Sequence, residues 1–240
     1  MRVMVLASGR GTDFQAIADH LQLGILRNVE LSCLVCNHSD APVLGRAEKM
    51  GVKALFFEGV TGLKFSSVKD REEKRLEFDR RCISLVREME LGLVVLAGFD
   101  QILTSQFVEA CPFKILNIHP AYDLRRFGGK NRVGRKVHEL VLQSGANYSG
   151  CTVHYVTADV DLGPAFLKKR VEISDKETPE SLEKKVLQLE HLAYPEAIQL
   201  VADERVIVAP DGKMCYVDRY SDDWDLEWEE RQQKYIVLNQ

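Results

Sequence analysis

Short, continuously apolar runs alternate along this chain with longer segments of helical periodicity. We predict strands at residues 2–7, 29–36, 52–57 and 91–99, and helices after the first strand, at 41–51 and at 71–89. Parallel strands covered on both faces are continuously apolar, whereas half-exposed strands alternate. The order therefore predicts an α/β fold with a doubly wound, mostly parallel sheet flanked by helices and a Rossmann-like N-terminal half.

The C-terminal half continues with two strands, at residues 151–156 and 164–173, and a long helix at 178–204. Thr178 is expected to cap that helix and Pro179 to occupy its first position. We expect Pro195 to kink or split it. The domain prediction is 1–208 for the main domain and 209–240 for a C-terminal extension, which either is solvated or packs on the body or a partner through Trp224 and Trp228.

The composition argues against nucleic-acid and membrane partners. The 240 residues carry a formal charge of -4 and a sequence pI near 5.9, which gives no general attraction to polyanions. The N-terminal apolar run enters a glycine turn too early for a signal peptide or a membrane span. Cys33 and Cys36 form a C-x-x-C motif within an apolar run, and no second pair completes a metal site. We therefore expect a cytoplasmic protein with reduced thiols and no metal.

Polar residues follow three of the predicted strands, where ligands bind in this architecture. The first group is the glycine turn "ASGRGTDFQAI", which follows strand one and allows positive φ beside a helix N-terminus. The second is "NIHP", with Asn117 and His119, which follows the run "KIL" at residues 114–116, a further predicted strand. The third is "VTADVDLGP", with Asp161. Each group alone is typical of an ordinary strand end or turn.

Together these motifs resemble one family. "SGRGTDFQAI", "VVLAGF", "LNIHP", "TVHYVTADVDLGP" and "EHLAYPEAI" occur in the order typical of the glycinamide ribonucleotide formyltransferases, over residues 1 to 208. The N-x-H pair with a downstream aspartate is shared with methionyl-tRNA formyltransferases and formyltetrahydrofolate deformylases. The resemblance therefore implies transfer of the formyl group of 10-formyltetrahydrofolate more firmly than it implies the acceptor.

The resemblance also implies roles for individual residues. Asn117 and His119 would stabilise the oxyanion of the tetrahedral intermediate, and Asp161 would orient His119 and relay a proton. Glu190 would bind the ammonium group of the acceptor. The phosphate would lie at the glycine turn and the pterin between two further segments. These binding residues are Gly9, Arg10, Gly11, Thr12 and Asp13 for the phosphate, and Phe99, Gln101, Ile102, Leu103, Val156 and Thr157 for the pterin.

The chain also departs from the family pattern. Asp13 replaces a common asparagine, Asp100 and Gln101 replace methionine and arginine, and a basic stretch follows the catalytic strand. That stretch is either a solvated loop or an anion site, and we favour Arg125 and Arg126 as ligands of a substrate anion. We expect His138 and His154 to have structural or supporting roles.

Three alternatives to formylation of glycinamide ribonucleotide stay open. The chain could formylate a different amine, hydrolyse 10-formyltetrahydrofolate, or bind folate without catalysis. The sequence shows neither the N-terminal regulatory domain of deformylases nor the C-terminal tRNA-binding domain of methionyl-tRNA formyltransferases, and the intact set of Asn117, His119 and Asp161 favours catalysis. We expect small-molecule substrates and a monomer or homodimer.

Overall fold

The computed structural model describes residues 1–130, 132, 134–218 and 222–239. Its internal contacts divide the chain into two units. The first comprises Met1–Gln15, Glu30–Asn117 and Val156–Ala158, and the second comprises Ala16–Val29, Ile118–Tyr155 and Asp159–Gln240. The division does not follow the order of the chain, because helix α1 (Thr12–Gln22) and strand β5 (Ile115–His119) each begin in the first unit and end in the second.

The first unit contains a parallel sheet. Strands β1 (Arg2–Ala7), β2 (Glu30–Cys36), β3 (Ala54–Phe56) and β4 (Leu93–Leu96) join β5 in the order β3-β2-β1-β4-β5. Strand β1 pairs in parallel with both β2 and β4, so the winding of the chain reverses there. The carboxyl ends of β1 and β4 lie at this switch point, where open α/β sheets bind ligands. The doubly wound prediction is confirmed.

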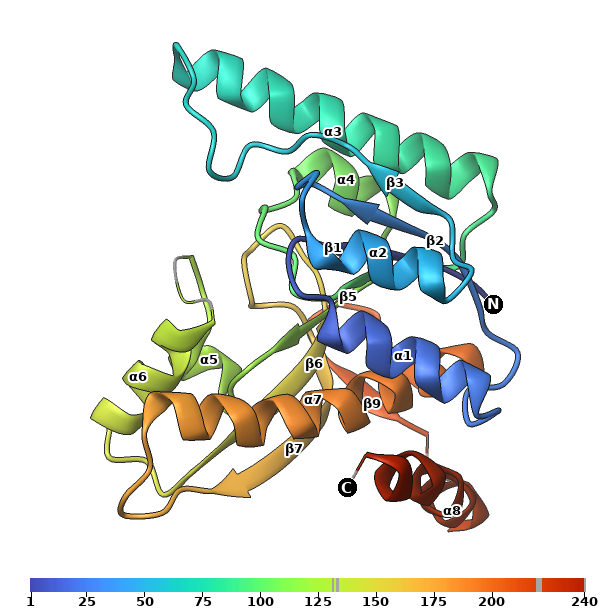
Figure 1. The fold of residues 1–240 in the computed structure, drawn as a ribbon, viewed down its shortest axis with the longest axis vertical. Coiled ribbons are helices and arrows are strands. Elements are labelled where there is room, and N and C mark those ends of the chain that lie inside the picture. Colours follow the sequence, from blue (N-terminus) through green and yellow to red (C-terminus); the bar gives the residue numbers. More distant parts are fainter. Residues whose placement is uncertain (131, 133, 219–221, 240) are drawn as a thin grey trace. The chain divides into compact units, whose positions relative to one another are not determined.

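Helices α2 (Pro42–Lys49), α3 (Val68–Glu88) and α4 (Ser105–Ala110) accompany this sheet. Helix α3, which lies next to α4 in Figure 1, is highly charged but buries Phe78, Asp79, Cys82 and Ile83. The Asp79 carboxylate is fully buried and accepts the backbone N–H of Thr104, the N-cap of α4, at 2.7 Å. A hydrogen bond of this kind offsets the cost of burying the carboxylate.

The second unit adds the remaining two strands of the seven-stranded sheet. Strand β6 (Tyr148–Tyr155) lies between β5 and β7 (Ala165–Glu172), and β6 and β7 are antiparallel. Helix α7 (Pro179–Ala202) contacts both of these strands and α6 (Arg135–Gln143), as Figure 1 shows. The capping prediction is confirmed, because the Thr178 side chain accepts the backbone N–H of Ser181 at 3.1 Å.

Two expectations are corrected. Pro195 does not split α7, which is one helix from Pro179 to Ala202. The basic stretch after β5 is not simply a loop, since it includes α5 (Leu124–Phe127) and the start of α6. Both helices bury apolar side chains within the second unit. The many charged residues of the stretch make this apolar pattern hard to recognise in the sequence. The buried apolar residues are Leu124, Phe127, Val137 and Val141.

The C-terminal extension packs on the second unit. It contains strand β9 (Cys215–Val217), which pairs with β8 (Val206–Val208), and helix α8 (Asp222–Leu238). Trp228 and Tyr235 are buried, and both rings contact the ring of His20 on α1. Of the two alternatives for the extension, solvated or packed, the structure shows the packed one. Within the described residues, no helix combines the length and apolar character needed to cross a membrane.

Candidate active site

The second unit brings His119 and Asp161 together. His119 ends β5, is 3% exposed, and places Nδ1 3.5 Å from Oδ2 of Asp161. Asp161 lies in the turn between β6 and β7 and has a positive φ of 57°. A non-glycine residue is rare in this conformation and must be held there by its surroundings. The two side chains of the predicted proton relay are therefore neighbours, although 42 positions separate them in the sequence.

Two further groups fix the Asp161 carboxylate. The backbone N–H of Gly129 donates to Oδ2 at 2.9 Å, and Nε2 of the buried His154 lies 3.6 Å from Oδ1. Burial alone would raise the pKa of Asp161, but His154, His119 and the Gly129 N–H outweigh it and hold the pKa below its ordinary value. Asp161 is consequently ionised at neutral pH.

The hydrogen bonds of His119 define its tautomer. Nε2 lies 3.1 Å from the carbonyl oxygen of Phe127, and because a carbonyl only accepts, Nε2 carries the hydrogen. Nδ1 faces Asp161 and is the ring nitrogen that exchanges a proton. Burial lowers the pKa of His119, against the opposing effects of Asp161 and the Phe127 carbonyl. A neutral imidazole beside an ionised carboxylate can accept a proton and be stabilised as the cation.

Asn117 belongs to the first unit, two residues before His119 on β5. Its side chain is half-buried.

The glycine turn lies in the first unit, between β1 and α1. Gly11 has a φ of 71°, and a Cβ there would lie 2.2 Å from Cγ2 of Val43, so only glycine fits. Asp13 is buried in the first turn of α1, and burial raises its pKa to about 6 despite the lowering effect of Arg10. The predicted phosphate residues therefore lie in one turn, which contains a carboxyl group of raised pKa. They are Gly9, Arg10, Gly11, Thr12 and Asp13.

The predicted pterin segments also meet within the first unit. Leu103 is part of its buried apolar core, and Phe99 and Val156 pack against that core. The backbone N–H of Asp100 donates to Ser8 Oγ at 2.9 Å, and Gln101 Oε1 accepts the N–H of Val60 at 2.8 Å. Ile102 is exposed and Thr157 is half-buried. Asp100, one of the residues that depart from the family pattern, is paired with Asn37 and His38.

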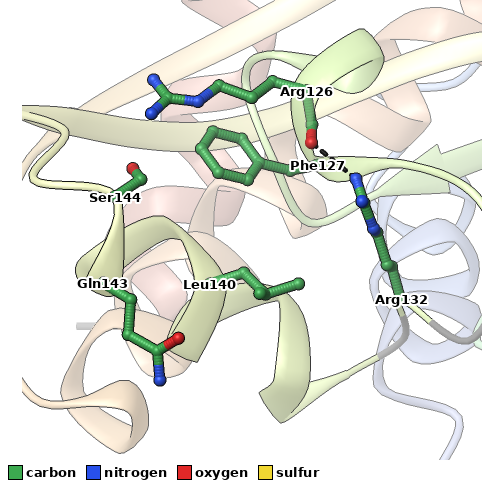
Figure 2. Close-up of a pocket in the computed structure, with 6 residues that line it drawn as sticks. All are labelled: Arg126, Phe127, Arg132, Leu140, Gln143 and Ser144. Atoms are coloured by element: carbon green, nitrogen blue, oxygen red, sulfur yellow. Dashed lines mark hydrogen bonds between the residues drawn. The ribbon is translucent and has the colours of Figure 1, made fainter.

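Arg125 and Arg126 are exposed on α5 in the second unit. Figure 2 shows Arg126 and Arg132 on either side of the Phe127 ring, at a pocket between α5 and α6. Two guanidinium groups at one pocket are suited to an anion. The residues that line the pocket are Arg126, Phe127, Arg132, Leu140, Gln143 and Ser144.

Glu190 is buried on α7, in the same unit as His119 and Asp161. His138 is buried on α6, and burial lowers its pKa against the effect of Glu183. Among the described residues, no three His, Cys, Asp or Glu side chains gather in a manner that would bind a metal ion.

Comparison with known proteins adds independent evidence. The model of the formyl transferase family matches residues 1–198. Phosphoribosylglycinamide formyltransferase of Bacillus subtilis (strain 168) is 32% identical over 197 residues, which are 81% of this chain and 91% of that protein. The trifunctional purine biosynthetic protein adenosine-3 of Gallus gallus is 34% identical over 218 residues, which are 90% of this chain but 20% of that protein. The chain thus spans about a fifth of this trifunctional relative.

A solved structure agrees with these relatives. The crystal structure of glycinamide ribonucleotide transformylase 1 from Symbiobacterium toebii superimposes with a TM-score of 0.78 and 33% identity. The match covers 90% of this chain and 93% of that chain.

Proposed function

The chain belongs to the formyl transferase family, and we propose that it transfers the formyl group of 10-formyltetrahydrofolate to the primary amine of glycinamide ribonucleotide. The observation that carries the proposal is the pair of His119 and Asp161 at the end of β5, with Nδ1 and Oδ2 3.5 Å apart. The similarity to a protein named phosphoribosylglycinamide formyltransferase supports glycinamide ribonucleotide as the formyl acceptor.

The chemistry accounts for these residue types. The amine attacks the formyl carbon, a carbon–nitrogen bond forms, and the formyl oxygen becomes an oxyanion. Prealigned donors at that oxygen lower the barrier. The Asn117 amide would supply one of them, and the Nδ1–H of His119, once Nδ1 has taken up a proton, would supply the other. When the intermediate collapses, the bond to the folate nitrogen breaks, the attacking nitrogen loses a proton and the folate nitrogen gains one. His119 Nδ1 and Asp161 would carry that proton.

The remaining residues would bind the two substrates. Backbone N–H groups of the turn at residues 9–13 would hold the phosphate, as helix N-termini do for anions. Glu190 would bind the ammonium of the acceptor before the amine is deprotonated. The folate would use Phe99, Gln101, Ile102, Leu103, Val156 and Thr157, several of which pack on one core.

The cellular context completes the proposal. We propose a cytoplasmic enzyme, monomeric or homodimeric, that uses 10-formyltetrahydrofolate as its co-substrate and no metal. The formyltransferase domain would span residues 1–208, and the extension would span residues 209–240. The extension would be a packed part of the second unit rather than a separate body.

A steady-state assay of 10-formyltetrahydrofolate consumption, with and without glycinamide ribonucleotide, tests the proposal. We expect turnover only with the acceptor, and formylated acceptor equal to the folate consumed. Turnover that does not depend on the acceptor would make the chain a hydrolase. Folate binding without turnover on any amine would make it a binding module.

A further inference from the structure

The glycine pair after α5, Gly128 and Gly129, lies against both members of the proton relay. The N–H of Gly129 donates to Asp161 Oδ2 at 2.9 Å. The carbonyl of Phe127, the preceding residue, accepts from His119 Nε2 at 3.1 Å. Three consecutive residues therefore hold the two side chains through backbone groups alone.

Each glycine is required for a different reason. A Cβ on Gly128 would lie 2.8 Å from Cβ of Asp161 and 2.5 Å from the carbonyl oxygen of Leu124, closer than real Cβ atoms approach. Gly129 has open space around its Cα but a φ of 108°, which L side chains rarely adopt. Gly128 thus allows close approach to Asp161, and Gly129 turns its N–H toward the carboxylate.

The glycine pair is tied down from its other side by Arg132. Nη1 of Arg132 donates to the carbonyl oxygen of Arg126 at 2.6 Å, the bond drawn in Figure 2, and to that of Gly128 at 3.2 Å. The N–H of Gly128 donates to the carbonyl oxygen of Leu124 at 2.7 Å. The N–H and the carbonyl of Gly128 are therefore both bonded to groups other than the side chains of His119 and Asp161.

We propose that Gly128 and Gly129 are positioning residues for formyl transfer, which set the separation of His119 and Asp161 and keep the Asp161 carboxylate charged, with Arg132 as their outer support. The inference rests on the proposed function. It predicts that the glycine pair affects the chemical step rather than the binding of either substrate.

The substitution Gly128→Ala tests this directly, because its methyl group would push Asp161 from its place. A displacement of about 1 Å at a catalytic group costs about a hundredfold, so we expect kcat to fall about 10- to 100-fold while both KM values change less than about threefold. The acid limb of the kcat profile, which reports protonation of His119, should move to lower pH, since a displaced Asp161 charge stabilises the His119 cation less.

Gly92→Ala is the matched control. Gly92, like Gly128, has no positive φ and a crowded Cβ position, 3.0 Å from Cγ of Met1, but it precedes β4 in the first unit. It reports the general cost of a crowded alanine, and we expect parental kcat. Arg132→Ala, which leaves the packing around Asp161 intact, is the second test if Gly128→Ala does not fold. It should lower kcat severalfold while both KM values stay within about threefold of the parent.

An NMR titration of His119 in the protein without substrate separates this inference from the proposed function. The His119 pKa should be lower in Gly128→Ala than in the parent, because the stabilising Asp161 charge is displaced. A folded Gly128→Ala with parental kcat, pH profile and His119 titration would overturn the inference. So would a loss no larger than that of Gly92→Ala. Failure of the parent to formylate glycinamide ribonucleotide would overturn only the proposed function.

Discussion

At the scale of single residues, the proposed proton relay of His119 and Asp161 gives the first prediction. If both act mainly in the transition state, His119→Ala and Asp161→Asn should each lower kcat by about 10²- to 10⁴-fold. Asp161→Asn retains the volume of the side chain and should leave the unfolding temperature nearly unchanged. Circular dichroism melts and steady-state kinetics check both points. Near-normal turnover in the folded variants would remove these residues from the mechanism.

Asp13 gives a second prediction at this scale. Its pKa is raised to about 6 by burial, so the carboxyl is neutral well below that pH and anionic above it. If the turn at residues 9–13 binds the substrate phosphate as proposed, an anionic Asp13 beside it is unfavourable. The KM for glycinamide ribonucleotide should therefore rise between pH 5 and about 7.

The variant Asp13→Asn isolates this effect. It should lower that KM severalfold at pH 7.5, remove most of its pH dependence, and leave the KM for folate unchanged. Ionisation of Asp13 should also lower the stability of the parent. A carboxyl whose folded pKa is raised stabilises the fold below its unfolded pKa, and this contribution is lost as the pH rises through 6. A KM for the acceptor that does not vary with pH in the parent would contradict this account.

At the scale of elements, the sequence predicts what depends on local patterns. The continuous apolar runs locate β1, β2 and β4, and Thr178 with Pro179 marks the start of α7, because these signals lie within a few residues. Helices α5 and α6 are not predicted, because their many charged residues outnumber the few apolar residues that form the buried face. The N-cap of α5, Asp123, with Leu124 and Phe127 three positions apart, is the signal that would have revealed that helix.

The site shows the same limit. The motifs identify Asn117, His119 and Asp161, but the contribution of His154 and of Gly128 and Gly129 depends on tertiary contacts. The N–H of Gly129 and the carboxylate that it binds are 32 positions apart. Chain order alone does not predict that a glycine pair in a basic stretch reaches an aspartate between two later strands.

Helix α5 gives the third prediction, which concerns its two exposed arginines. If Arg125 and Arg126 hold a substrate anion, replacing both with alanine should raise the KM for one substrate about 10- to 100-fold, since charge-assisted bonds to an anion contribute a few kcal/mol at most. Turnover at saturation should change little, and added salt should partly reproduce the effect in the parent. The backbone carbonyl of Arg126 that binds Arg132 survives the substitution.

Arg71→Ala with Arg80→Ala is the control for that prediction. It removes the same charge from exposed positions of α3 in the first unit and should leave both KM values at the parental level. Unchanged constants in the α5 variant would show that its arginines are only solvated.

At the scale of the whole molecule, the extension is part of the second unit rather than an appendage. Arg231 on α8 donates to the Ile25 carbonyl at 3.1 Å, and Gln232 donates to the Leu192 carbonyl at 2.9 Å. Trp228 and Tyr235 are buried against His20 of α1. Helix α8 therefore packs on α1, on the segment that follows α1, and on α7. Removal of residues 209–240 would expose this surface, so the extension contributes to the stability of the unit that carries His119 and Asp161.

The last prediction concerns the pH dependence of that packing, which centres on His20. Its ring lies 4.2 Å from the ring of Tyr235, between centroids, and its Nδ1 donates to the Ala16 carbonyl at 2.7 Å. Burial lowers its pKa from 6.5 to about 4, with Asp19 opposing and His191 reinforcing the shift. Protonation therefore favours states in which His20 is exposed. The loss of stability should begin as pH falls below 6.5 and be complete below about 4, reaching at most about 3 kcal/mol.

Tryptophan fluorescence follows this transition selectively, because both tryptophans, Trp224 and Trp228, lie in α8. We expect the fluorescence of the parent to change as the solution is acidified from pH 6.5 to 4, with the thermal midpoint falling over the same range. In His20→Gln, which cannot take up a proton, both changes should be much smaller. A parent whose fluorescence is constant to pH 4, or a variant with the same pH midpoint, would show that α8 is held independently of His20. A transition confined to the parent would establish that packing of the extension requires a neutral His20.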